Sequence, residues 1–374
     1  MKIGIDARFF NESGVGRYLR NLIINLQVID KKNEYYVLLL QKDWEALKET
    51  KNFHKVLADF KWYGFAEQFK LPKLLKQLKL DLVHFPHFNV PVFYTGKFVV
   101  TIHDLIHQHH QASSATTLDP FRSKLKQIGY RKAFKVAVSK SQKILVPSKF
   151  VRQSLQTEWK VNGEKVVITY EGVDDSILKA SAKIGSEDIK KVLNKFKIKK
   201  PFIFYVGNAH PHKNVEGLIK TFLILQKKNK DLKLVLSGYD HFFWQRLKKE
   251  NQQEGIIYTG FVTDEELVVL YHEAEAFVLP SFEEGFGIPV LEAMACSCPV
   301  VASKVGSLPE VGGPASAEAA LYFNPTSEKD MAEKISRVLD SKNLRKKLIE
   351  KGLKRYKQFS WRKLAEKTLE AYSE

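Results

Sequence analysis

The stretch LPSFEEGFGIPVLEAMA, residues 279–295, combines the end of an apolar run, a glycine-rich loop and a helical pattern. The run AFVLPS (276–281) predicts a buried strand, and PVLEAMA predicts a helix with Pro289 in its first turn, where the missing N–H is not needed. In an open α/β sheet, ligands bind at the carboxyl ends of the strands. The intervening loop FEEGFG is therefore where we expect chemistry.

Short apolar runs alternate with helical patterns along the whole chain. The expected strands cover 2–8, 35–40, 82–86, 98–104, 143–148 and 166–173 in the first half, then 201–208, 233–238, 255–261, 276–281, 298–303 and 320–325 in the second. Such continuous apolar runs are typical of parallel strands that are covered on both faces. The pattern predicts an α/β protein of two doubly wound domains, joined near residues 175–200.

Length and composition agree with this expectation. The chain has 374 residues, of which 44% are hydrophobic and 27% charged, values typical of a globular protein of two domains. The N-terminal sequence lacks the apolar core of a secretory signal, and no apolar stretch reaches the roughly 18 residues of a membrane helix, so we expect a cytoplasmic protein. Cys296 and Cys298 are too close for a disulfide framework and too few for a zinc site, which favours small buried side chains.

The positive charge is concentrated in the first half of the chain. The formal net charge is +18, and residues 122–149 contain nine basic residues and no acid. The segment 61–80 likewise mixes lysine with aromatic residues and leucine. Both segments fit either a solvated helix face or a face that meets an anionic membrane surface, as in a protein bound peripherally at the inner face of the membrane. We find no motif of a nucleic-acid-binding module and expect no nucleic acid partner.

The loop at 282–287 has the composition of a site for a nucleotide sugar. Gly285 and Gly287 permit close approach of the backbone, and the N–H groups at the start of the following helix attract phosphate. Glu284 and Glu292 repel phosphate but accept hydrogen bonds from hydroxyls. One carboxylate would therefore hold ribose and the other the transferred sugar. Taken alone, both residues also fit a plain loop acid and a helix-surface acid.

The stretch closely resembles the motif of the retaining glycosyltransferases of family 4, two glutamates separated by seven residues around Gly-Phe-Gly. The resemblance extends over nearly the full chain, through GVGRYLRNLI (14–23), TIHDL (101–105), YVGN and HKN (205–214), GFVTDEEL (260–267), PVVAS (299–303) and the C-terminal FSWRKLAEKTLEAY. It implies a GT-B fold with two Rossmann-like domains facing across a cleft. The expected domains are an acceptor-binding domain, 1–178, and a nucleotide-sugar-binding domain, 196–358, with a C-terminal helix, 359–374, that crosses back to the first domain.

The resemblance also implies roles for individual residues. His103 and Glu284 are the expected catalytic residues, in contact with hydroxyls of the transferred sugar. Lys213 is expected at the diphosphate, since its ammonium is a point charge suited to phosphate. The full set of expected donor-binding residues is Gly14, Gly16, Gly207, Asn208, Lys213, Phe261, Val262, Leu267, Gly285, Phe286, Gly287, Ile288 and Glu292, with Phe261, Val262 and Leu267 around the nucleobase and Glu292 at the ribose.

Several of these residues have simpler interpretations. His103 is also compatible with a hydrogen-bonded core histidine, and Gly14-Val15-Gly16 with an ordinary turn before a helix. In GFVTDEEL, Thr263 predicts a helix N-cap, with Glu266 completing a capping box.

The histidines raise two further questions. Asn208 departs from the family pattern, because many relatives carry arginine there; a protonated His210 or His212 would supply the missing cation. The cluster His107, His109 and His110 has no acid at ligand spacing, and the resemblance implies transfer without a metal or other cofactor, so we expect surface histidines.

The predicted function is retaining transfer of a hexose from a nucleotide sugar to a glycan or lipid-linked acceptor. The string YVGNAHPHKN resembles members that use GDP-mannose, which makes mannose the expected sugar. A UDP-sugar transferase, an epimerase of the same fold and a catalytically idle GT-B protein at the membrane surface stay open as alternatives. The expected mechanism is a front-face transfer, in which the leaving diphosphate accepts the proton of the acceptor and Lys213 stabilises its charge.

Overall fold

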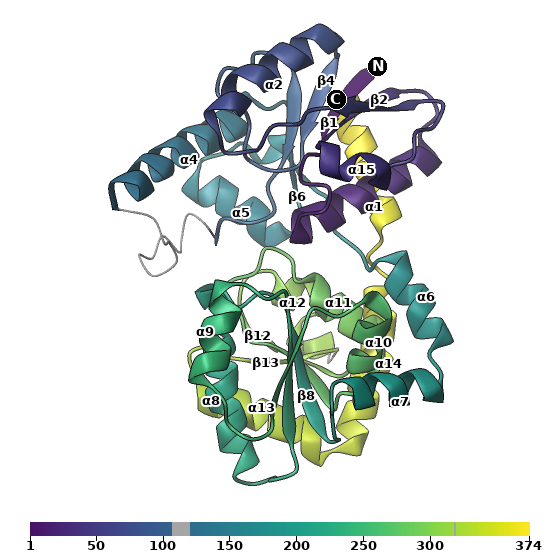
Figure 1. Cartoon of the computed structure of the whole chain (residues 1–374), viewed down its shortest axis with the longest axis vertical. Helices are drawn as coiled ribbons and strands as arrows, with labels where there is room; N and C mark the ends of the chain where they lie inside the picture. Colours follow the sequence, from purple (N-terminus) through teal and green to yellow (C-terminus); the bar gives the residue numbers. More distant parts are fainter. Residues whose placement is uncertain (107–119, 318) are drawn as a thin grey trace. The chain divides into compact units, whose positions relative to one another are not determined.

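The structure of the chain, a computed structural model, describes residues 1–106, 120–317 and 319–374. It divides into two compact units (Figure 1). Unit 1 contains Met1–Leu105, the residues from Pro120 to Glu171, and Ser360–Glu374; unit 2 contains Ile106 and Gly172–Phe359. No described helix is long and apolar enough to cross a membrane.

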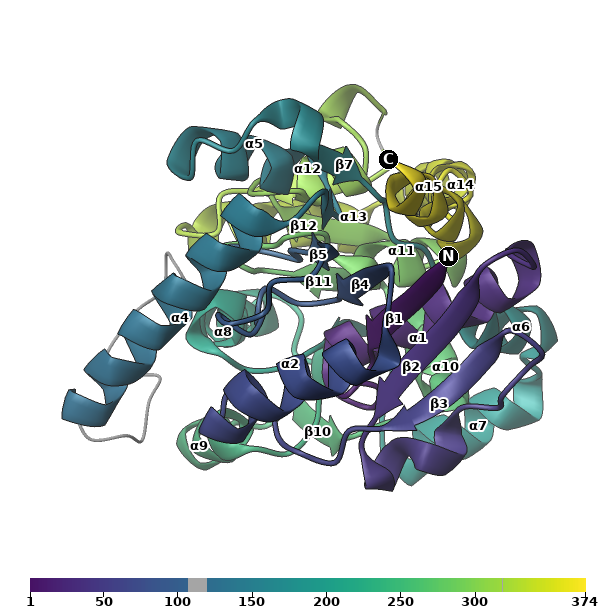
Figure 2. The same cartoon turned by 90° about the horizontal axis from the view of Figure 1, so that it is seen from above.

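Unit 1 is built on a seven-stranded parallel sheet with the order β3-β2-β1-β4-β5-β6-β7 (Figure 2). The order reverses between β1 and β4, which makes the carboxyl ends of these strands the expected ligand site. The strands are β1 (Lys2–Asp6), β2 (Glu34–Leu39), β3 (Phe53–Leu57), β4 (Leu82–Phe85), β5 (Phe98–Thr101), β6 (Ile144–Val146) and β7 (Val166–Ile168).

The edge strand β3 is the one strand of this sheet that the sequence did not predict. Its sequence FHKVL contains a histidine and a lysine, and only Phe53 is buried. An edge strand has one sheet neighbour and less cover, so it does not need the continuous apolar run that marks the central strands.

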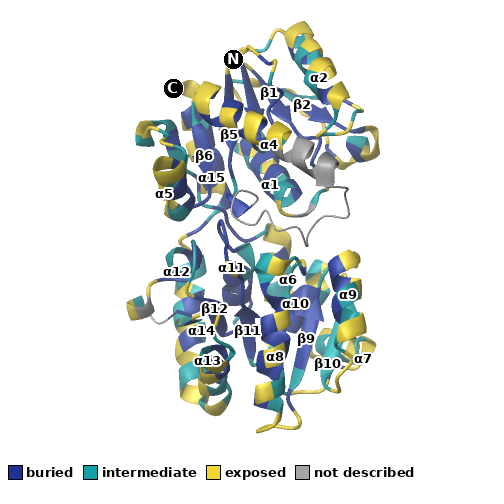
Figure 3. Cartoon of the chain, turned by 90° about the vertical axis from the view of Figure 1, so that its left-hand side faces the viewer, coloured by how far each residue is buried: buried dark blue, intermediate teal, exposed yellow. Residues whose placement is uncertain are grey.

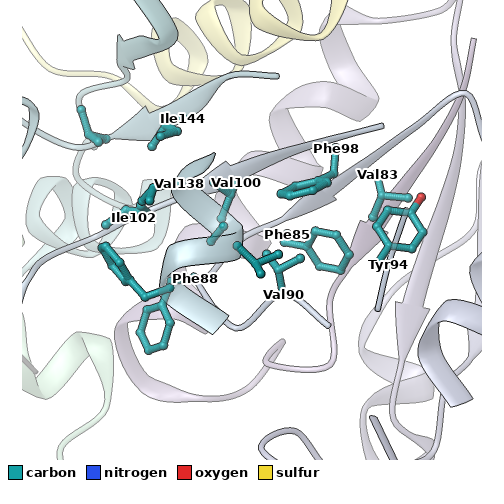
Figure 4. Close-up of a cluster of buried hydrophobic side chains, with 14 of the residues drawn as sticks. Val83, Phe85, Phe88, Val90, Tyr94, Phe98, Val100, Ile102, Val138 and Ile144 are labelled. Carbon is teal, nitrogen blue, oxygen red and sulfur yellow. The ribbon is translucent and has the colours of Figure 1, made fainter. Parts of the chain in front are cut away.

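Helices cover both faces of the unit 1 sheet. On one face, α2, α4 and α5 contribute Leu71, Phe134 and Leu155 to a core cluster that contains Phe85 and Phe98 of the sheet (Figure 4). On the other face, α1 and α15 pack against each other (Figure 2). The helical segments of unit 1 are α1 (Ser13–Ile29), η1 (Gln41–Ala46), α2 (Phe65–Leu78), α4 (Pro120–Lys140), α5 (Lys149–Glu158), η3 (Gly163–Lys165) and α15 (Trp361–Ser373).

The C-terminal helix α15 returns to unit 1, as the resemblance implied. Its Tyr372 hydroxyl lies 2.7 Å from Nδ1 of the buried His84 on β4. The other ring nitrogen of His84 lies 2.8 Å from Oγ1 of Thr101, which in turn lies 2.9 Å from the hydroxyl of Tyr18 on α1. The helix is therefore joined to the centre of the sheet by polar contacts as well as by packing.

Unit 2 is built on a six-stranded parallel sheet with the order β10-β9-β8-β11-β12-β13. All six strands were predicted, and the order reverses between β8 and β11. The strands are β8 (Phe202–Val206), β9 (Lys233–Ser237), β10 (Ile256–Gly260), β11 (Ala276–Leu279), β12 (Val300–Ser303) and β13 (Leu321–Phe323).

The helical segments of unit 2 lie on both sides of this sheet (Figure 1). They are α6 (Asp175–Lys183), α7 (Ser186–Lys195), η4 (Pro211–Lys213), α8 (Val215–Gln226), α9 (Phe242–Glu250), α10 (Asp264–Glu273), α11 (Ile288–Ala295), α12 (Leu308–Val311), η5 (Ala315–Ala317), α13 (Glu328–Asp340) and α14 (Lys342–Tyr356). With α6 and α7 packed against α10, residues 175–195 are part of this unit. The two-domain parallel α/β class predicted from the sequence is confirmed.

A buried charge network fixes the loops at the carboxyl end of β1. Arg8 is fully buried and contacts Asp6 at 2.7 Å and Glu67 at 2.6 Å. Glu67, in the first turn of α2, also accepts hydrogen bonds from the Asn89 side chain, at 2.9 and 2.8 Å, and from the Tyr63 N–H, at 2.9 Å. Burial raises the pKa of Glu67, although the positive charge of Arg8 opposes the shift. The network ties α2 and two loops to the end of β1.

We expect Glu67→Ala to destabilise unit 1 by about 3–5 kcal/mol, because removing one partner leaves a buried guanidinium with only part of its compensation. Urea unfolding followed by tryptophan fluorescence reports mainly on this unit, since Trp44, Trp62, Trp159 and Trp361 belong to it. Lys70→Ala, an exposed change on the same helix, is the control. A loss below about 1 kcal/mol for Glu67→Ala would show that Asp6 alone compensates Arg8.

Candidate active site

The centre of the candidate site in unit 2 is an ion pair between two loops. Lys213, at the end of η4, follows β8, and Glu284 follows β11. Their Nζ and Oε1 atoms are 2.8 Å apart, and the Ser281 hydroxyl donates to the same oxygen at 2.7 Å. The side chains remain 17% and 10% exposed. Two residues that the sequence assigned to diphosphate and to sugar are therefore in direct contact.

The backbones of these two loops are fastened to each other. The Phe282 N–H donates to the His212 carbonyl at 2.8 Å. Asn214, in a left-handed conformation with φ of 54°, donates from Nδ2 to the carbonyls of Pro280 at 3.1 Å and Pro325 at 3.0 Å. Asparagine suits this position, because it tolerates the left-handed region and its amide reaches both carbonyls. The HKN motif thus supplies a cation and the residue that holds it in place.

The glycine loop enters α11 as the sequence predicted. Gly287 has φ of 96°, and a Cβ atom there would lie 2.6 Å from the Leu308 side chain. Ile288 begins the helix, and no side-chain cap offsets the positive end of its dipole. Pro289 has no N–H, and the Val290 N–H donates to the Gly287 carbonyl at 3.0 Å. Gly285 lies between Glu284 and Phe286, whose buried ring packs 5.8 Å from that of Phe359.

A third loop, after β12, supports the glycine loop. The Ser307 hydroxyl donates to the carbonyls of Glu284 at 3.0 Å and Phe286 at 2.9 Å. Gly306 has φ of 55°, and a Cβ atom there would lie 2.6 Å from the Glu284 carbonyl oxygen. Neither residue was predicted from the sequence, although both follow the predicted strand 298–303 closely, which was a usable signal.

Glu292 lies on α11 and is only 1% exposed. Its Oε2 accepts a hydrogen bond from the Tyr271 hydroxyl at 3.1 Å. The carboxylate is therefore positioned by a buried partner from α10, which the sequence did not predict. Its assignment to the ribose stays a prediction.

An exposed aromatic pair marks the ends of β9 and β10. Phe261 is 70% exposed, and its ring centroid lies 6.4 Å from that of Tyr239, which is 74% exposed. Of the other residues expected around the nucleobase, Val262 and Leu267 are buried. Tyr239 was missed, although it follows the predicted strand 233–238. The two ring planes are at 73°, so each ring separately exposes a flat apolar face on which a base can stack.

The capping box predicted in the same segment is confirmed. The Thr263 N–H donates to Oε2 of Glu266 at 3.0 Å, and the Glu266 N–H donates to the Thr263 hydroxyl at 3.4 Å. These two residues therefore begin α10 and have a structural role.

The backbone after β8 comes close to that after β9. A Cβ atom on Gly238 would lie 2.2 Å from the carbonyl oxygen of Gly207. Asn208 is exposed, and its carbonyl accepts from the Tyr205 hydroxyl at 2.6 Å.

Three histidine rings lie close together in the segments that follow β8 and β9. Two of them, His210 and His212, follow Asn208, the position where many family members carry arginine. The His210 ring lies 5.8 Å from that of His212, nearly parallel to it, and 5.4 Å from that of His241. The backbone N–H of His210 donates to the side-chain oxygen of Asn208 at 3.2 Å. The structure thus brings the rings of His210 and His212, the two candidate substitutes for the missing arginine, close to each other and to a third histidine.

In unit 1, His103 follows β5 and is held at both ring nitrogens. Nε2 lies 2.9 Å from the Pro86 carbonyl, and Nδ1 lies 3.3 Å from Oε1 of Glu171. Burial lowers the pKa of His103, but the hydrogen bond and charge of Glu171 outweigh it and raise the pKa above its ordinary value of 6.5. A protonated imidazole fits this geometry because it donates from both nitrogens. Glu171 was not predicted as a site residue; it lies within the predicted strand 166–173, whereas β7 ends at Ile168.

A second histidine beside this pair has the opposite character. Burial, and then the charge of His103, lower the pKa of His84 to about 3. Tyr18 separates the two, with its ring centroid 4.9 Å from His103 and 6.3 Å from His84. The partly exposed imidazole of His103 is thus favoured as a cation, and the buried imidazole of His84 as a neutral group.

Gly14 and Gly16 lie in the first turn of α1 rather than in a turn before it, which corrects the predicted boundary. A Cβ atom on Gly16 would lie 2.6 Å from the Phe10 carbonyl oxygen, whereas one on Gly14 would meet nothing within 4 Å. Glycine is therefore required at position 16 for close packing of the β1–α1 loop on the helix. The N-cap residue, Glu12, makes no side-chain cap.

The remaining site predictions concern metals and thiols. His107, His109 and His110 lie outside the described residues. Within the described ranges, no group of three or more His, Cys, Asp or Glu residues could hold a metal ion. Cys296 and Cys298 are free and buried, as predicted, and burial raises the pKa of the Cys296 thiol to about 12.

Each half of the chain matches a glycosyltransferase family model. The family model "Glycosyltransferase Family 4" matches residues 13–177, and the model "Glycosyl transferases group 1" matches residues 186–355. The chain is 31% identical to O-antigen chain mannosyltransferase B of Escherichia coli over 80% of this chain and 75% of that protein. It is 27% identical to O-antigen chain mannosyltransferase RfbU of Salmonella typhimurium over 74% of this chain and 70% of that protein.

Two solved structures share the whole fold. Sucrose-phosphate synthase from Thermosynechococcus elongatus matches with a TM-score of 0.76 and 19% identity, covering 100% of this chain and 98% of that one. WaaG, a glycosyltransferase involved in lipopolysaccharide biosynthesis, matches with a TM-score of 0.75 and 16% identity, covering 98% of each chain. The predicted GT-B fold is confirmed.

We expect Glu171→Gln to lower the pKa of His103, because the variant keeps a side chain of similar shape and removes the negative charge. The pKa can be measured from the histidine ring resonances in NMR titrations, with His103→Asn to assign the signal. Because the folded-state pKa is raised, the stabilisation from this pair is complete below about pH 6.5 and is lost as the pH rises through the folded-state value. The stability gap between wild type and variant should shrink accordingly above pH 6.5, and an unchanged His103 pKa would contradict the assigned pair.

Proposed function

The chain belongs to the family 4 glycosyltransferases, and on that basis we propose that it transfers a mannosyl group from GDP-mannose to a glycan or lipid-linked glycan, with retention of the anomeric configuration. The observation that carries the choice of sugar is the 31% identity to O-antigen chain mannosyltransferase B over four-fifths of the chain. The second mannosyltransferase, at 27% identity, supports the same choice.

Unit 2 is the proposed donor-binding unit. Phosphate oxygens of the donor would meet the positive end of the α11 dipole, backbone N–H groups of the loop at Gly285–Gly287 and the ammonium of Lys213. Glu284 is negative, so it cannot face the phosphates directly without repulsion. Its 2.8 Å contact with Lys213 supports an arrangement in which the ammonium lies towards the phosphates and the carboxylate towards sugar hydroxyls.

The rest of the donor extends along the neighbouring strand ends. Because the ring planes of Tyr239 and Phe261 are at 73°, we propose that one ring stacks on the nucleobase and the other contacts its edge. Glu292 is proposed to accept hydrogen bonds from the ribose. The contact between Glu292 and the Tyr271 hydroxyl engages one carboxylate oxygen and fixes its direction. His210 and His212 are proposed to meet the diphosphate where Asn208 replaces the usual arginine.

The proposed chemistry is a front-face substitution. The bond from the anomeric carbon to the diphosphate oxygen breaks, the acceptor oxygen attaches on the same face, and the acceptor proton moves to the departing diphosphate. Lys213 and the N–H groups of the loop at Gly285–Gly287 stabilise the negative charge that grows on the diphosphate. The reaction is proposed to need no metal. His103 is proposed to contact the transferred sugar, with Glu171 fixing the orientation of its ring.

Calorimetric titration with GDP, UDP and ADP tests the donor. We expect GDP alone to bind in the micromolar range or tighter, since the three nucleotides share phosphates and ribose and differ only in the base. Incubation with GDP-mannose and a mannose-containing acceptor should then release GDP, and NMR of the product should show the α configuration of the donor.

Other results of these assays would replace the proposal. Binding of UDP alone would make the protein a UDP-sugar transferase. Nucleotide binding without transfer to any acceptor would favour the idle or the epimerase alternative, and a β-linked product would exclude retention.

Two isosteric variants separate ribose from sugar contacts. Glu292→Gln should weaken GDP binding by about 1–3 kcal/mol, the range for hydrogen bonds to a charged group, while Gln still accepts from Tyr271. Glu284→Gln should lower kcat by about tenfold or more and change GDP affinity less, because GDP lacks the transferred sugar. Glu265→Gln, an exposed change in the same unit, is the control. Equal losses of affinity in both variants would mean that the two roles are assigned wrongly.

A further inference from the structure

The outward face of α2 exposes aromatic side chains to solvent. Phe65 is 90% exposed and Phe69 is 64% exposed. They are four residues apart and lie on one stripe of the helix, which Lys73 and Lys76 continue at the next turns. Figure 3 shows this outer side of α2 as exposed. Burying such rings releases free energy in proportion to the apolar area covered, so their full exposure needs an explanation.

The aromatic surface is structurally fixed. The Phe69 ring stacks on Phe93, which is 59% exposed, with the ring centroids 5.6 Å apart and the planes at 25°. Phe93 lies in the loop between β4 and β5, and the neighbouring Val92 N–H donates to the Gln68 side chain at 2.8 Å. The opposite side of α2 is anchored in the core by Glu67 and Leu71. We call the surface made by Phe65, Phe69, Phe93, Lys70, Lys73 and Lys76 the α2 face.

All exposed charges of α2 are positive. Lys70, Lys73 and Lys76 are exposed, whereas Glu67, the only acid of this helix, is fully buried against Arg8. The helix therefore presents cations and aromatic rings together, without a carboxylate at the surface.

From this arrangement we propose that the α2 face docks on an anionic lipid bilayer. The three phenylalanine rings would enter the boundary between headgroups and acyl chains, and the lysines would meet headgroup phosphates, as expected of an interfacial amphipathic helix. The proposal concerns unit 1 and does not depend on the identity of the sugar donor.

The chemistry of the surface favours a bilayer over a glycan or a protein. Glycan sites pair aromatic rings with carboxylates or amides that bind hydroxyls, whereas the exposed charged groups of α2 are all ammonium groups. A protein partner would also meet three flexible lysines, which are depleted in protein interfaces. Rings surrounded by lysines complement a negative surface with an apolar interior.

Vesicle sedimentation with the full-length protein tests the proposal. Vesicles of phosphatidylcholine with about one-third phosphatidylglycerol should bind the protein at 0.1 M salt, and pure phosphatidylcholine vesicles should bind it at least tenfold more weakly. Binding should decrease at 1 M salt, because the screening length falls from about 10 Å to 3 Å. Equal binding to both vesicles, or no binding to the anionic ones, would overturn the proposal.

Matched variants locate the contact. The pair Phe65→Ser and Phe69→Ser, and separately the set Lys70→Gln, Lys73→Gln and Lys76→Gln, should each weaken binding to anionic vesicles at least tenfold. The control for lost apolar surface is Ile24→Ser with Val28→Ser, two residues of α1 that are 56% and 62% exposed. The control for lost charge is Lys227→Gln, Lys228→Gln and Lys230→Gln, three exposed lysines of unit 2.

Equal losses in the variants and their controls would show unspecific attraction and overturn the α2 face as the docking site. Unchanged binding in the α2 variants would do the same. GDP titration of every variant distinguishes this result from a failure of the proposed function, because binding of nucleotide should be unaffected by changes on α2. Loss of an interaction with a soluble oligosaccharide or an added protein, with vesicle binding intact, would reassign the surface to that partner.

Discussion

Both units depend on the same constraint. The loops at the carboxyl ends of the strands where the strand order reverses must be fixed in place, although the hydrogen bonds of the sheet do not extend to them. Each unit meets it with a charge pair between segments that are far apart in sequence. In unit 1, Arg8 joins the end of β1 to the first turn of α2 through Glu67. In unit 2, Lys213 joins the loop after β8 to the loop after β11 through Glu284. The difference between the pairs lies in their exposure. Arg8 and Glu67 are both 0% exposed at the side chain, so their network is closed to any ligand. Lys213 and Glu284 retain 17% and 10%, so the same kind of contact leaves both groups able to bind.

The surroundings of this second pair explain how a strongly charged site keeps its shape. A carboxylate and an ammonium near the surface attract each other only weakly in water, and long side chains lose conformational freedom when they are held. Here the supporting atoms come from neutral neighbours: Ser281 fixes the carboxylate, Asn214 fixes the loop that carries the lysine, and Ser307 fixes the backbone of Glu284. His103 follows the same design in unit 1, where Pro86 and Glu171 hold its two nitrogens. A reacting group that is fixed in advance loses less entropy when the substrate arrives.

The sequence predicted those features that follow from local pattern. Continuous apolar runs located twelve of the strands, and the Gly-Phe-Gly loop predicted both the left-handed Gly287 and the start of α11. It did not predict β3, whose half-covered residues have no apolar run, nor the partners that only the fold brings together. Tyr271 beside Glu292, Glu171 beside His103 and Asn214 across two loops are each separated from their partner by many residues. These residues form no recognisable motif in the sequence. Their role becomes visible only when the fold brings them next to their partners. The charge pair of Lys213 and Glu284 was missed for the same reason, although both residues were chosen.

Both units expose aromatic rings at their surface, but in different chemical surroundings. Leaving apolar area in water forfeits about 25 cal/mol per Å² that burial would release, so neighbouring exposed rings are the ones whose surroundings matter. Unit 2 exposes Tyr239 and Phe261 at strand ends, within the half of the sheet edge that carries the candidate donor residues. Unit 1 exposes Phe65 and Phe69 on the outer side of a helix, among lysines. A flat ring at a strand end suits a planar base, whereas rings among cations on a helix suit an anionic interface. The chemistry around each pair, rather than the rings themselves, therefore separates a ligand surface from a docking surface. The buried Glu67 contributes to this separation, because its contact with Arg8 removes the one negative charge that would otherwise oppose an anionic partner on α2.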